Sequence, residues 1–250
     1  MSLKISIWLL FLFCIQPLHS FAKESISAEL TAVANSNPLL QYQEQGENKG
    51  PSVEILNALL TEANLNANLV FMPWARAFST AKNVSNTLVL SMIRTPEREA
   101  DFHWIIKVSQ AVRVFISLKN ESENYVSTIE QAKNKLIGVV LDTAAHKELK
   151  LAGFSEKKNL YIISSEVEMV RLLANNRIDL VYSDPNNIKK NLQIIGKGNI
   201  AIRHKEIVLK NQRESYIALN INTDEKIVNQ LKQAAEKFIQ TEEYSYLVAK

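Results

Sequence analysis

Residues 87–98 read TLVLSMIRTPER, an apolar run that leads into a Thr-Pro-Glu sequence and an arginine. Four consecutive apolar or β-branched residues at 87–90 are typical of a buried strand. Thr95 and Pro96 fit the cap and first turn of a helix, which would hold Arg98 on a short rigid segment. Ligands of parallel α/β sheets bind beyond the carboxyl ends of the strands, so this segment lies where a ligand would bind.

Upstream of this stretch, strand-like and helix-like segments alternate. Residues 30–34 and 69–72 are short apolar runs. From residue 51 onward, apolar side chains recur at spacings of three and four, which is one stripe of a helix. A further helix is expected at 74–82. Strands that alternate with helices favour a mostly parallel sheet with helices on its faces.

The same alternation starts again after an extended stretch at 112–118. The segments expected to follow are a capping box at Ser127 with Glu130, a strand at 136–141, a helix at 144–151, a strand at 160–163, a capping box at Ser165 with Glu168, a strand at 178–182, a helix from Pro185, strands at 206–209 and 216–219, and an amphipathic helix at 227–238. One architectural unit therefore occurs twice, and we predict an α/β protein with two lobes.

The N-terminus has the three parts of a cleavable export signal: a lysine, an apolar run at 5–15, and small residues at Ser20 and Ala22. A membrane-spanning helix needs about 20 apolar residues, and this run is shorter. We therefore predict a signal peptide over residues 1–22 and a periplasmic protein. Cys14 follows large apolar residues, whereas lipid attachment requires small ones, so we expect no lipid anchor.

Composition narrows the chemistry. Cleavage would remove the single cysteine, and with it disulfides, thiolate nucleophiles and cysteine-ligated metals. The 228 residues left of 250 exceed the commonest size of a single domain, which agrees with two lobes. With Lys+Arg 29 and Asp+Glu 26, the charges nearly balance, and nothing favours a nucleic-acid or membrane-surface partner.

Enzyme signatures are missing from the sequence. It contains no His-Glu-x-x-His, no Gly-x-Ser-x-Gly and no glycine-rich phosphate loop. His103, His146 and His204 lie far apart along the chain and do not predict a triad or a metal site. We expect no metal ion, no cofactor and no catalytic residue.

Arg98 has two interpretations. Arginine is suited to gripping a carboxylate through two parallel hydrogen bonds. On residue chemistry alone, the alternative is somewhat favoured, in which Arg98 pairs on a solvated surface with Glu97, Glu99 or Asp101.

Two further positions follow predicted strands. Asp184 is suited to binding an amino group, or to capping the helix at Pro185, and these two roles are compatible. Residues 138–144 run from a strand into a helix start, where backbone N–H groups favour an anion and the Thr143 hydroxyl adds a donor. The alternative is that Thr143 or Asp142 simply caps that helix.

Together these segments resemble the family 3 periplasmic solute-binding proteins, a group that includes the polar amino acid binders of ATP-driven importers. The likeness covers nearly the whole mature chain. Its matching segments are 50–56, 71–77, 91–98 followed by Phe102 and Trp104, 137–139 with Thr143, and 177–181 up to Asp184.

The resemblance implies a periplasmic-binding-protein clamshell whose two lobes are joined by two hinge strands. Lobe 1 would comprise residues 23–117 plus 210–250, and lobe 2 residues 118–209. By resemblance, Arg98 holds an amino acid's α-carboxylate and Asp184 its α-amino group.

The resemblance also suggests supporting residues. Ser91 and Thr143 fall at hydrogen-bonding positions, Tyr42 and Trp74 are candidate aromatic walls, and Arg76 is a further candidate ligand-binding residue. The chain departs from the family pattern at Asp142, where a glycine is usual, and at Ile93, where a hydroxyl residue is common.

The function implied is capture of a small polar solute, an amino acid or a similar carboxylate or zwitterion, for ABC-type import. We expect a monomer, with a membrane permease or receptor as its further partner. Two alternatives remain: an enzyme resembling cyclohexadienyl dehydratase, in which Glu54, Glu97 or Asp142 would act as general acid, and an orphan sensor-type binding protein acting on a membrane receptor.

Overall fold

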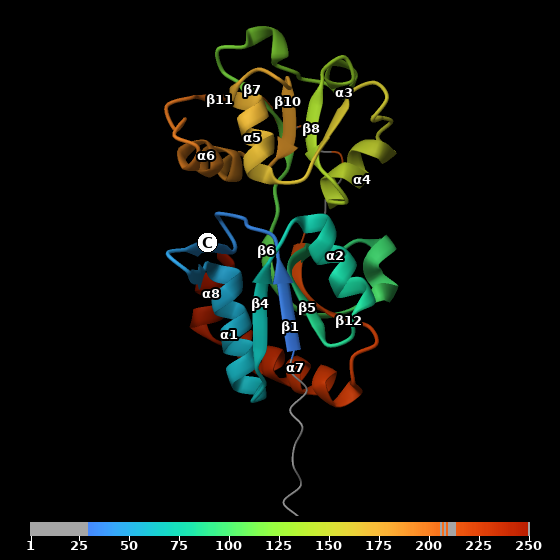
Figure 1. The fold of residues 1–250 in the computed structure, drawn as a ribbon, viewed down its shortest axis with the longest axis vertical. Coiled ribbons are helices and arrows are strands. Elements are labelled where there is room, and N and C mark those ends of the chain that lie inside the picture. The colour runs from blue at the N-terminus through green and yellow to red at the C-terminus, as the bar shows by residue number, and fades with distance from the viewer. Residues whose placement is uncertain (1–29, 206, 208, 210–213, 250) are drawn as a thin grey trace, which may run out of the picture.

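The computed structural model describes residues 30–205, 207, 209 and 214–249. The signal peptide expected at 1–22 lies outside the described residues. The described elements form two α/β lobes, one above the other in Figure 1, each built on its own five-stranded sheet.

The first lobe contains the sheet β4-β1-β5-β12-β6. Its strands are β1 (Leu30–Ala34), β4 (Ala67–Phe71), β5 (Thr87–Ile93), β6 (Phe102–Gln110) and β12 (Glu214–Asn220). Its helices are α1 (Pro51–Ala63), α2 (Trp74–Asn83), the 3-10 helix η1 (Pro96–Asp101), α7 (Glu225–Phe238) and α8 (Glu242–Ala249). A small hairpin, β2 (Tyr42–Glu44) with β3 (Glu47–Lys49), precedes α1.

The second lobe contains the sheet β11-β7-β10-β8-β9. Its strands are β7 (Val114–Leu118), β8 (Ile137–Val140), β9 (Leu160–Ile163), β10 (Leu180–Ser183) and β11 (Ile202–Lys205). Its helices are η2 (Ser122–Asn124), α3 (Ile129–Ala132), α4 (Ala144–Leu151), α5 (Glu166–Ala174) and α6 (Pro185–Ile194).

The two sheets share one pattern of strand directions. In the first, β4, β1 and β5 are parallel, β12 runs against β5, and β6 runs against β12, so that β12 alone is reversed. In the second, β9, β8 and β10 are parallel, and β7 alone is reversed because it is antiparallel to both β10 and β11. The prediction of two mostly parallel sheets flanked by helices is confirmed.

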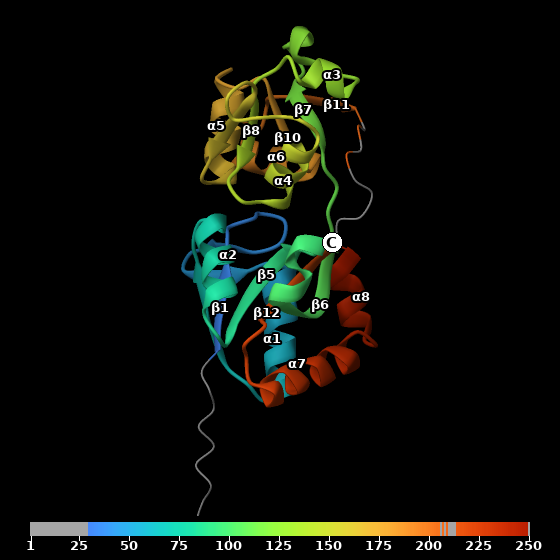
Figure 2. The same ribbon diagram turned by 90° about the vertical axis from the view of Figure 1, so that its right-hand side faces the viewer.

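The chain passes between the lobes at two places. The connection from β6 to β7 runs through residues 111–113 and is visible between the lobes in Figure 2. The return from β11 to β12 lies partly outside the described residues. Because β7 pairs with β10 and β11, the chain has already joined the second sheet at Val114, a few residues before the division expected at 117.

Several element boundaries differ from the sequence prediction. The strand expected at 206–209 is wrong, since β11 ends at Lys205 and residues 207 and 209 are not in a strand. The helix start expected at Ser127 is displaced by one residue: Thr128 accepts a hydrogen bond from the backbone N–H of Gln131 at 3.2 Å. The Gln131 side chain also accepts from the backbone N–H of Ser127 at 2.8 Å, which ties the residue before the cap to the first turn of α3.

Alternating burial in the strands explains how helices cover each sheet. In β1, Leu30 and Ala32 pack in a cluster with α1 and α7, whereas Val33 packs in another cluster with Ala77 of α2. The second cluster continues into the other lobe through residues such as Val181, so apolar side chains are in contact across the junction of the lobes.

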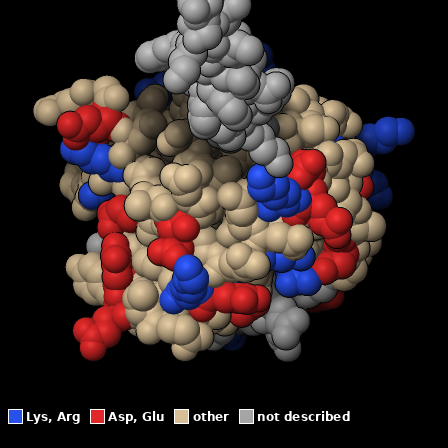
Figure 3. Space-filling view, turned by 90° about the horizontal axis from the view of Figure 1, so that it is seen from below, with Lys and Arg blue, Asp and Glu red and all other residues tan. Residues whose placement is uncertain are grey.

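The surface of the first lobe is mixed in charge. Seen from below, Lys and Arg side chains are interleaved with Asp and Glu side chains (Figure 3). Two of the ion pairs of this lobe are Lys237 with Glu62 at 2.6 Å and Lys82 with Asp101 at 2.8 Å. Within the described ranges, the helices are too short or too polar to cross a membrane.

Helix α4 offers a matched test of core packing. Leu149 is 0% exposed in the core of the second lobe, whereas Leu151 on the same helix is 78% exposed. We expect Leu149→Ala to lower the free energy of unfolding by about 2–5 kcal/mol, because it removes buried methyl groups and leaves a cavity. Leu151→Ala should change it by less than about 0.5 kcal/mol. Urea unfolding followed by circular dichroism measures both, and equal effects would contradict the packing described.

Candidate functional site

A cavity of about 400 Å³ lies between the two lobes. Its walls come from the residues that end or follow six strands, three in each lobe. They are residues 35–37 after β1, 71–74 at the end of β4, 91 and 93 of β5, 139, 140 and 143–145 around the end of β8, 164–167 after β9 and 182–184 at the end of β10. The strand-end position expected for a ligand therefore corresponds to a real cavity.

Three helices of the second lobe begin at the cavity wall. The N-cap residues of α4, α5 and α6 are Thr143, Ser165 and Asp184, and each side chain accepts a backbone N–H of its own helix. The capping alternatives for Thr143 and Asp184 are thus realised. Since both residues also line the cavity, capping holds them at its wall.

Arg98 is buried at this wall, with 1% of its surface exposed. Its Nη1 donates to the carbonyl oxygen of Ile93 at 3.0 Å, and its guanidinium lies over the rings of Phe78 and Trp74, at 4.7 and 5.4 Å from their centroids. Burial, followed by the charge of Arg113, lowers the Arg98 pKa to about 10, so it stays protonated at neutral pH.

The surface-pairing alternative for Arg98 is wrong. Glu99 pairs instead with Arg94, and Asp101 with Lys82. The buried Nε–H of Arg98 has no hydrogen-bond partner among the described residues. A buried, charged donor at a cavity wall without an acceptor indicates a place for an anionic ligand group.

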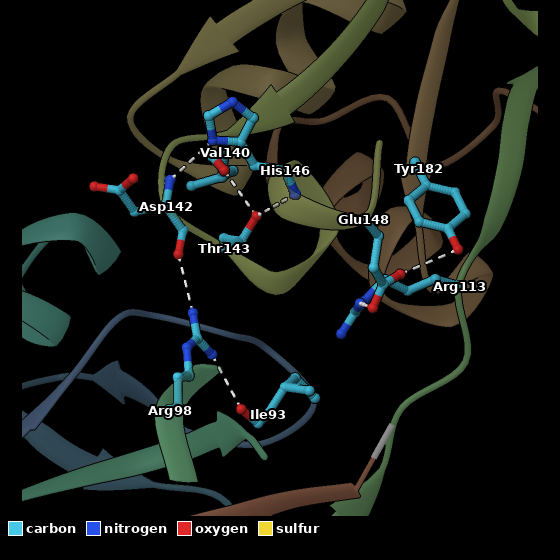
Figure 4. Close-up of polar contacts among 9 residues, drawn as sticks. All are labelled: Ile93, Arg98, Arg113, Val140, Asp142, Thr143, His146, Glu148 and Tyr182. Carbon is cyan, nitrogen blue, oxygen red and sulfur yellow. Dashed lines mark hydrogen bonds and ion pairs between the residues drawn. The ribbon is translucent and has the colours of Figure 1, made fainter. Parts of the chain in front are cut away.

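The backbone carbonyl of Asp142 connects the lobes. It accepts a hydrogen bond from Arg98 Nη2 at 3.0 Å (Figure 4). It also accepts one from Trp74 Nε1 at 2.9 Å, and both donors belong to the first lobe. Asp142 has φ +57°, in the left-handed region that glycine enters freely and that aspartate tolerates. This conformation explains why the position suits the glycine that is usual in the family.

A second polar group lies where the chain enters the second lobe. Arg113 Nη1 donates to Glu148 Oε1 at 2.7 Å, and Glu148 Oε2 accepts from the Tyr182 hydroxyl at 3.3 Å (Figure 4). Arg113 and Tyr182 also line the cavity. The guanidinium charge of Arg113 is therefore paired with a carboxylate of α4.

Two carboxylates of the second lobe, those of Glu166 and Asp184, line the cavity. Glu166 is the first residue of α5, and its Oε2 accepts from Asn187 Nδ2 at 2.7 Å. Asp184 Oδ1 accepts from the backbone N–H groups of Asn186 at 2.7 Å and Asn187 at 3.4 Å. Burial raises the pKa of the Glu166 carboxyl above its usual value. The hydrogen bond from Asn187 acts in the opposite direction but does not cancel the rise.

Ser91 makes its hydrogen bonds within the first lobe. Its Oγ donates to Gln41 Oε1 at 2.6 Å and lies 2.8 Å from Ser52 Oγ. Ser91 has a φ of +54° within β5 and is, like Asp142, a non-glycine residue in the left-handed region. Ser91 lines the cavity. Such strained conformations cluster at binding sites, where the surrounding structure holds them in place.

The structure brings together five of the seven candidate ligand-binding residues. Around the cavity lie Arg98, Asp184, Ser91, Thr143 and Trp74.

Tyr42 and Arg76 are not in its wall. Tyr42 sits on β2 and faces a separate depression beside the start of α1. Arg76 is exposed, because residues two apart on a helix point to different sides and Trp74 takes the buried one.

Sequence reasoning missed Glu166 and Arg113. Glu166 follows the strand at 160–163 and the cap Ser165, which is the same strand-end signal that identified Asp184. Arg113 lies in an extended stretch and had no comparable signal. Within the described residues, no group of three or more His, Cys, Asp or Glu could hold a metal ion.

These features define a two-lobed solute-binding fold, with a cavity between the lobes that apolar and charged side chains line together. Residues 30–250 match the family model of bacterial extracellular solute-binding proteins, family 3, and the chain belongs to that family. No curated protein matches the sequence.

Several solved structures share the fold. A histidine kinase sensor domain with similarity to periplasmic binding proteins has a TM-score of 0.76 at 13% identity, over 88% of this chain and 94% of the other. An amino acid ABC transporter substrate-binding protein from Streptococcus pneumoniae, bound to L-arginine, has a TM-score of 0.73 at 16% identity, over 88% of this chain and 93% of the other. The arginine-, lysine-, histidine-binding protein of Geobacillus stearothermophilus has a TM-score of 0.71 at 19% identity, over 89% of this chain and 96% of the other.

The contact at the Asp142 carbonyl can be tested through Trp74. Trp74→Phe keeps the ring but removes the Nε1 donor, a loss of about 0.5–1.5 kcal/mol. We expect the population with separated lobes to rise about two- to tenfold. Spin labels on Thr61→Cys and Lys150→Cys would report the distance between the lobes.

Trp104→Phe is the matched control, because the Trp104 Nε1–H has no partner among the described residues. An equal change in both variants would show that the effect does not come from the hydrogen bond to Asp142.

Proposed function

We propose that this protein is an extracytoplasmic binding protein for a small carboxylate-bearing zwitterion, such as an amino acid. The observation that carries the proposal is the unpartnered, buried Nε–H of Arg98 at the wall of the cavity. A ligand carboxylate would accept from Nε–H and from a second guanidinium N–H, in the two-bond geometry that arginine favours.

The opposite ends of a zwitterion would contact different lobes. Arg98 belongs to the first lobe, and Asp184 to the second. A solute that bridges them makes more contacts when the lobes are together than when they are apart. Since a ligand shifts a conformational equilibrium only through such differential contacts, binding would favour the closed arrangement.

Binding can be measured by isothermal titration calorimetry with a panel of amino acids, organic acids and polyamines. We expect at least one zwitterionic amino acid to bind, and Arg98→Ala to weaken it by about a hundredfold or more, as two charge-assisted hydrogen bonds are lost. Glu99→Ala, at an exposed neighbour, should bind as the unaltered protein does.

Thermal melting checks that the Arg98 variants fold. If the alanine variant does not fold, Arg98→Lys takes its place, because lysine keeps the positive charge but lacks the paired guanidinium donors. Full affinity in a folded Arg98 variant would contradict the carboxylate role. Absence of binding by every amino acid would contradict the proposed function itself.

The expected division, a lobe of residues 23–117 plus 210–250 and a lobe of 118–209, enters this proposal with one change: residues 114–117 go with the second lobe, because β7 pairs with β10 and β11. So is a monomeric protein that delivers its solute to a membrane permease. The sensor alternative retains support from the likeness to a histidine kinase sensor domain. Permease and ATPase genes beside this gene would favour import, whereas a kinase gene would favour sensing.

We propose a binding role without catalysis. The family and the compared structures are described mainly as binding proteins, and no catalytic motif was found in the sequence. Sustained product formation from prephenate or arogenate would instead favour the dehydratase alternative.

Export is the remaining part of the proposal. We expect cleavage after Ala22, so that the protein recovered from the periplasm begins at Lys23. Mass spectrometry of the intact protein measures this directly. A retained N-terminus, or the mass of a lipid on Cys14, would contradict it.

A further inference from the structure

The charged groups at the cavity are not balanced against one another. Arg113 is paired with Glu148, which leaves Arg98 as the cation available to a ligand. Glu166 and Asp184 both line the cavity, and their partners are neutral: an amide for the first, backbone N–H groups for the second. With both acids ionised, this set has a net charge of about −1, so a solute of charge about +1 would balance it.

Glu166 is held in place by a chain of amides. Asn191 Nδ2 donates to Asn187 Oδ1 at 2.9 Å, which turns the Asn187 amide nitrogen toward Glu166. Asn187 is 3% exposed and Asn191 is fully buried. The same Asn187 donates its backbone N–H to Asp184, so one residue holds the two carboxylates close together.

The two carboxylates disfavour each other's negative charge. Burial raises the pKa of Glu166, and the nearby charge of Asp184 acts in the same direction. Arg113 and the Asn187 hydrogen bond oppose that rise but do not cancel it. A positively charged ligand group would relieve both the burial and the repulsion.

We propose that Glu166 is a specificity-determining residue that binds a second cationic group of the solute, an ammonium or a guanidinium. The solute is then a cationic amino acid, with its carboxylate at Arg98, its α-amino group at Asp184 and its side-chain cation at Glu166. This inference rests on the proposed function and adds the charge of the ligand to it.

Calorimetry with paired ligands tests the proposal. L-Lysine and L-norleucine differ in the terminal amino group, and L-arginine and L-citrulline differ in the guanidinium charge. We expect at least one cationic ligand to bind about tenfold or more tightly than its neutral counterpart. Glu166→Gln should remove that preference by weakening the cationic ligand, because its amide can still accept from Asn187 but carries no charge.

Glu168→Gln is the matched control. Glu168 lies on the same helix, is exposed, and does not line the cavity. This variant should keep the preference for the cationic ligand. Thermal melting of both variants would show whether either substitution disturbs the fold.

The pH dependence gives a second readout. The charged groups that face Glu166 are Asp184 and Arg113. Because the Glu166 pKa is raised, protonation of this carboxyl should weaken binding of the cationic ligand as the pH falls toward the acid range. Glu166→Gln should have a flatter pH profile.

The outcomes separate the two proposals. If neutral or acidic amino acids bind as well as the cationic ones, or if Glu166→Gln leaves the preference unchanged, the role of Glu166 is overturned while the binding function stands. If no amino acid binds, both proposals fail.

Discussion

The direction of the strands is the constraint on which the rest of the structure depends. In each lobe, four strands run one way, and the reversed one is the strand by which the chain arrives from the other lobe: β7 in the second lobe and β12 in the first. The parallel strands of both sheets consequently end at one shared cavity. Residues that are far apart in sequence, such as Arg98 and Asp184, are thereby brought to the walls of one cavity.

Two non-glycine residues near the junction of the lobes have left-handed backbone conformations. Ser91 and Asp142 adopt φ near +55° without being glycine, which costs each of them about 1–2 kcal/mol. At Asp142, this conformation is accompanied by a carbonyl oxygen that accepts hydrogen bonds from two donors of the opposite lobe. The close approach of the lobes therefore depends on the backbone of the second lobe as well as on ligand-facing side chains.

Much of this organisation could be read from the sequence, because strands, caps and helix stripes are local signals. The ranges 30–34, 144–151 and 160–163 were predicted to the residue. β6 was missed because its buried and half-buried side chains do not alternate regularly, and its only sheet partner among the described strands is the distant β12. The site divides in the same way. Asp184 and Thr143 follow from strand ends, whereas the pairing of Arg113 with Glu148 depends on how the chain enters the second sheet, which no local pattern encodes.

The crossing between the lobes has a mechanical consequence. On the first-lobe side, the hydroxyl groups of Ser109 and Ser215 lie 2.6 Å apart and tie β6 to β12. On the second-lobe side, Arg113 is fastened to Glu148. Between these two ties, the forward crossing has three residues, 110–112, a span of about 10 Å when extended. Opening is thus confined to a short pivot, and Arg113 would travel with the second lobe as it swings, so the hinge itself moves part of the cavity wall.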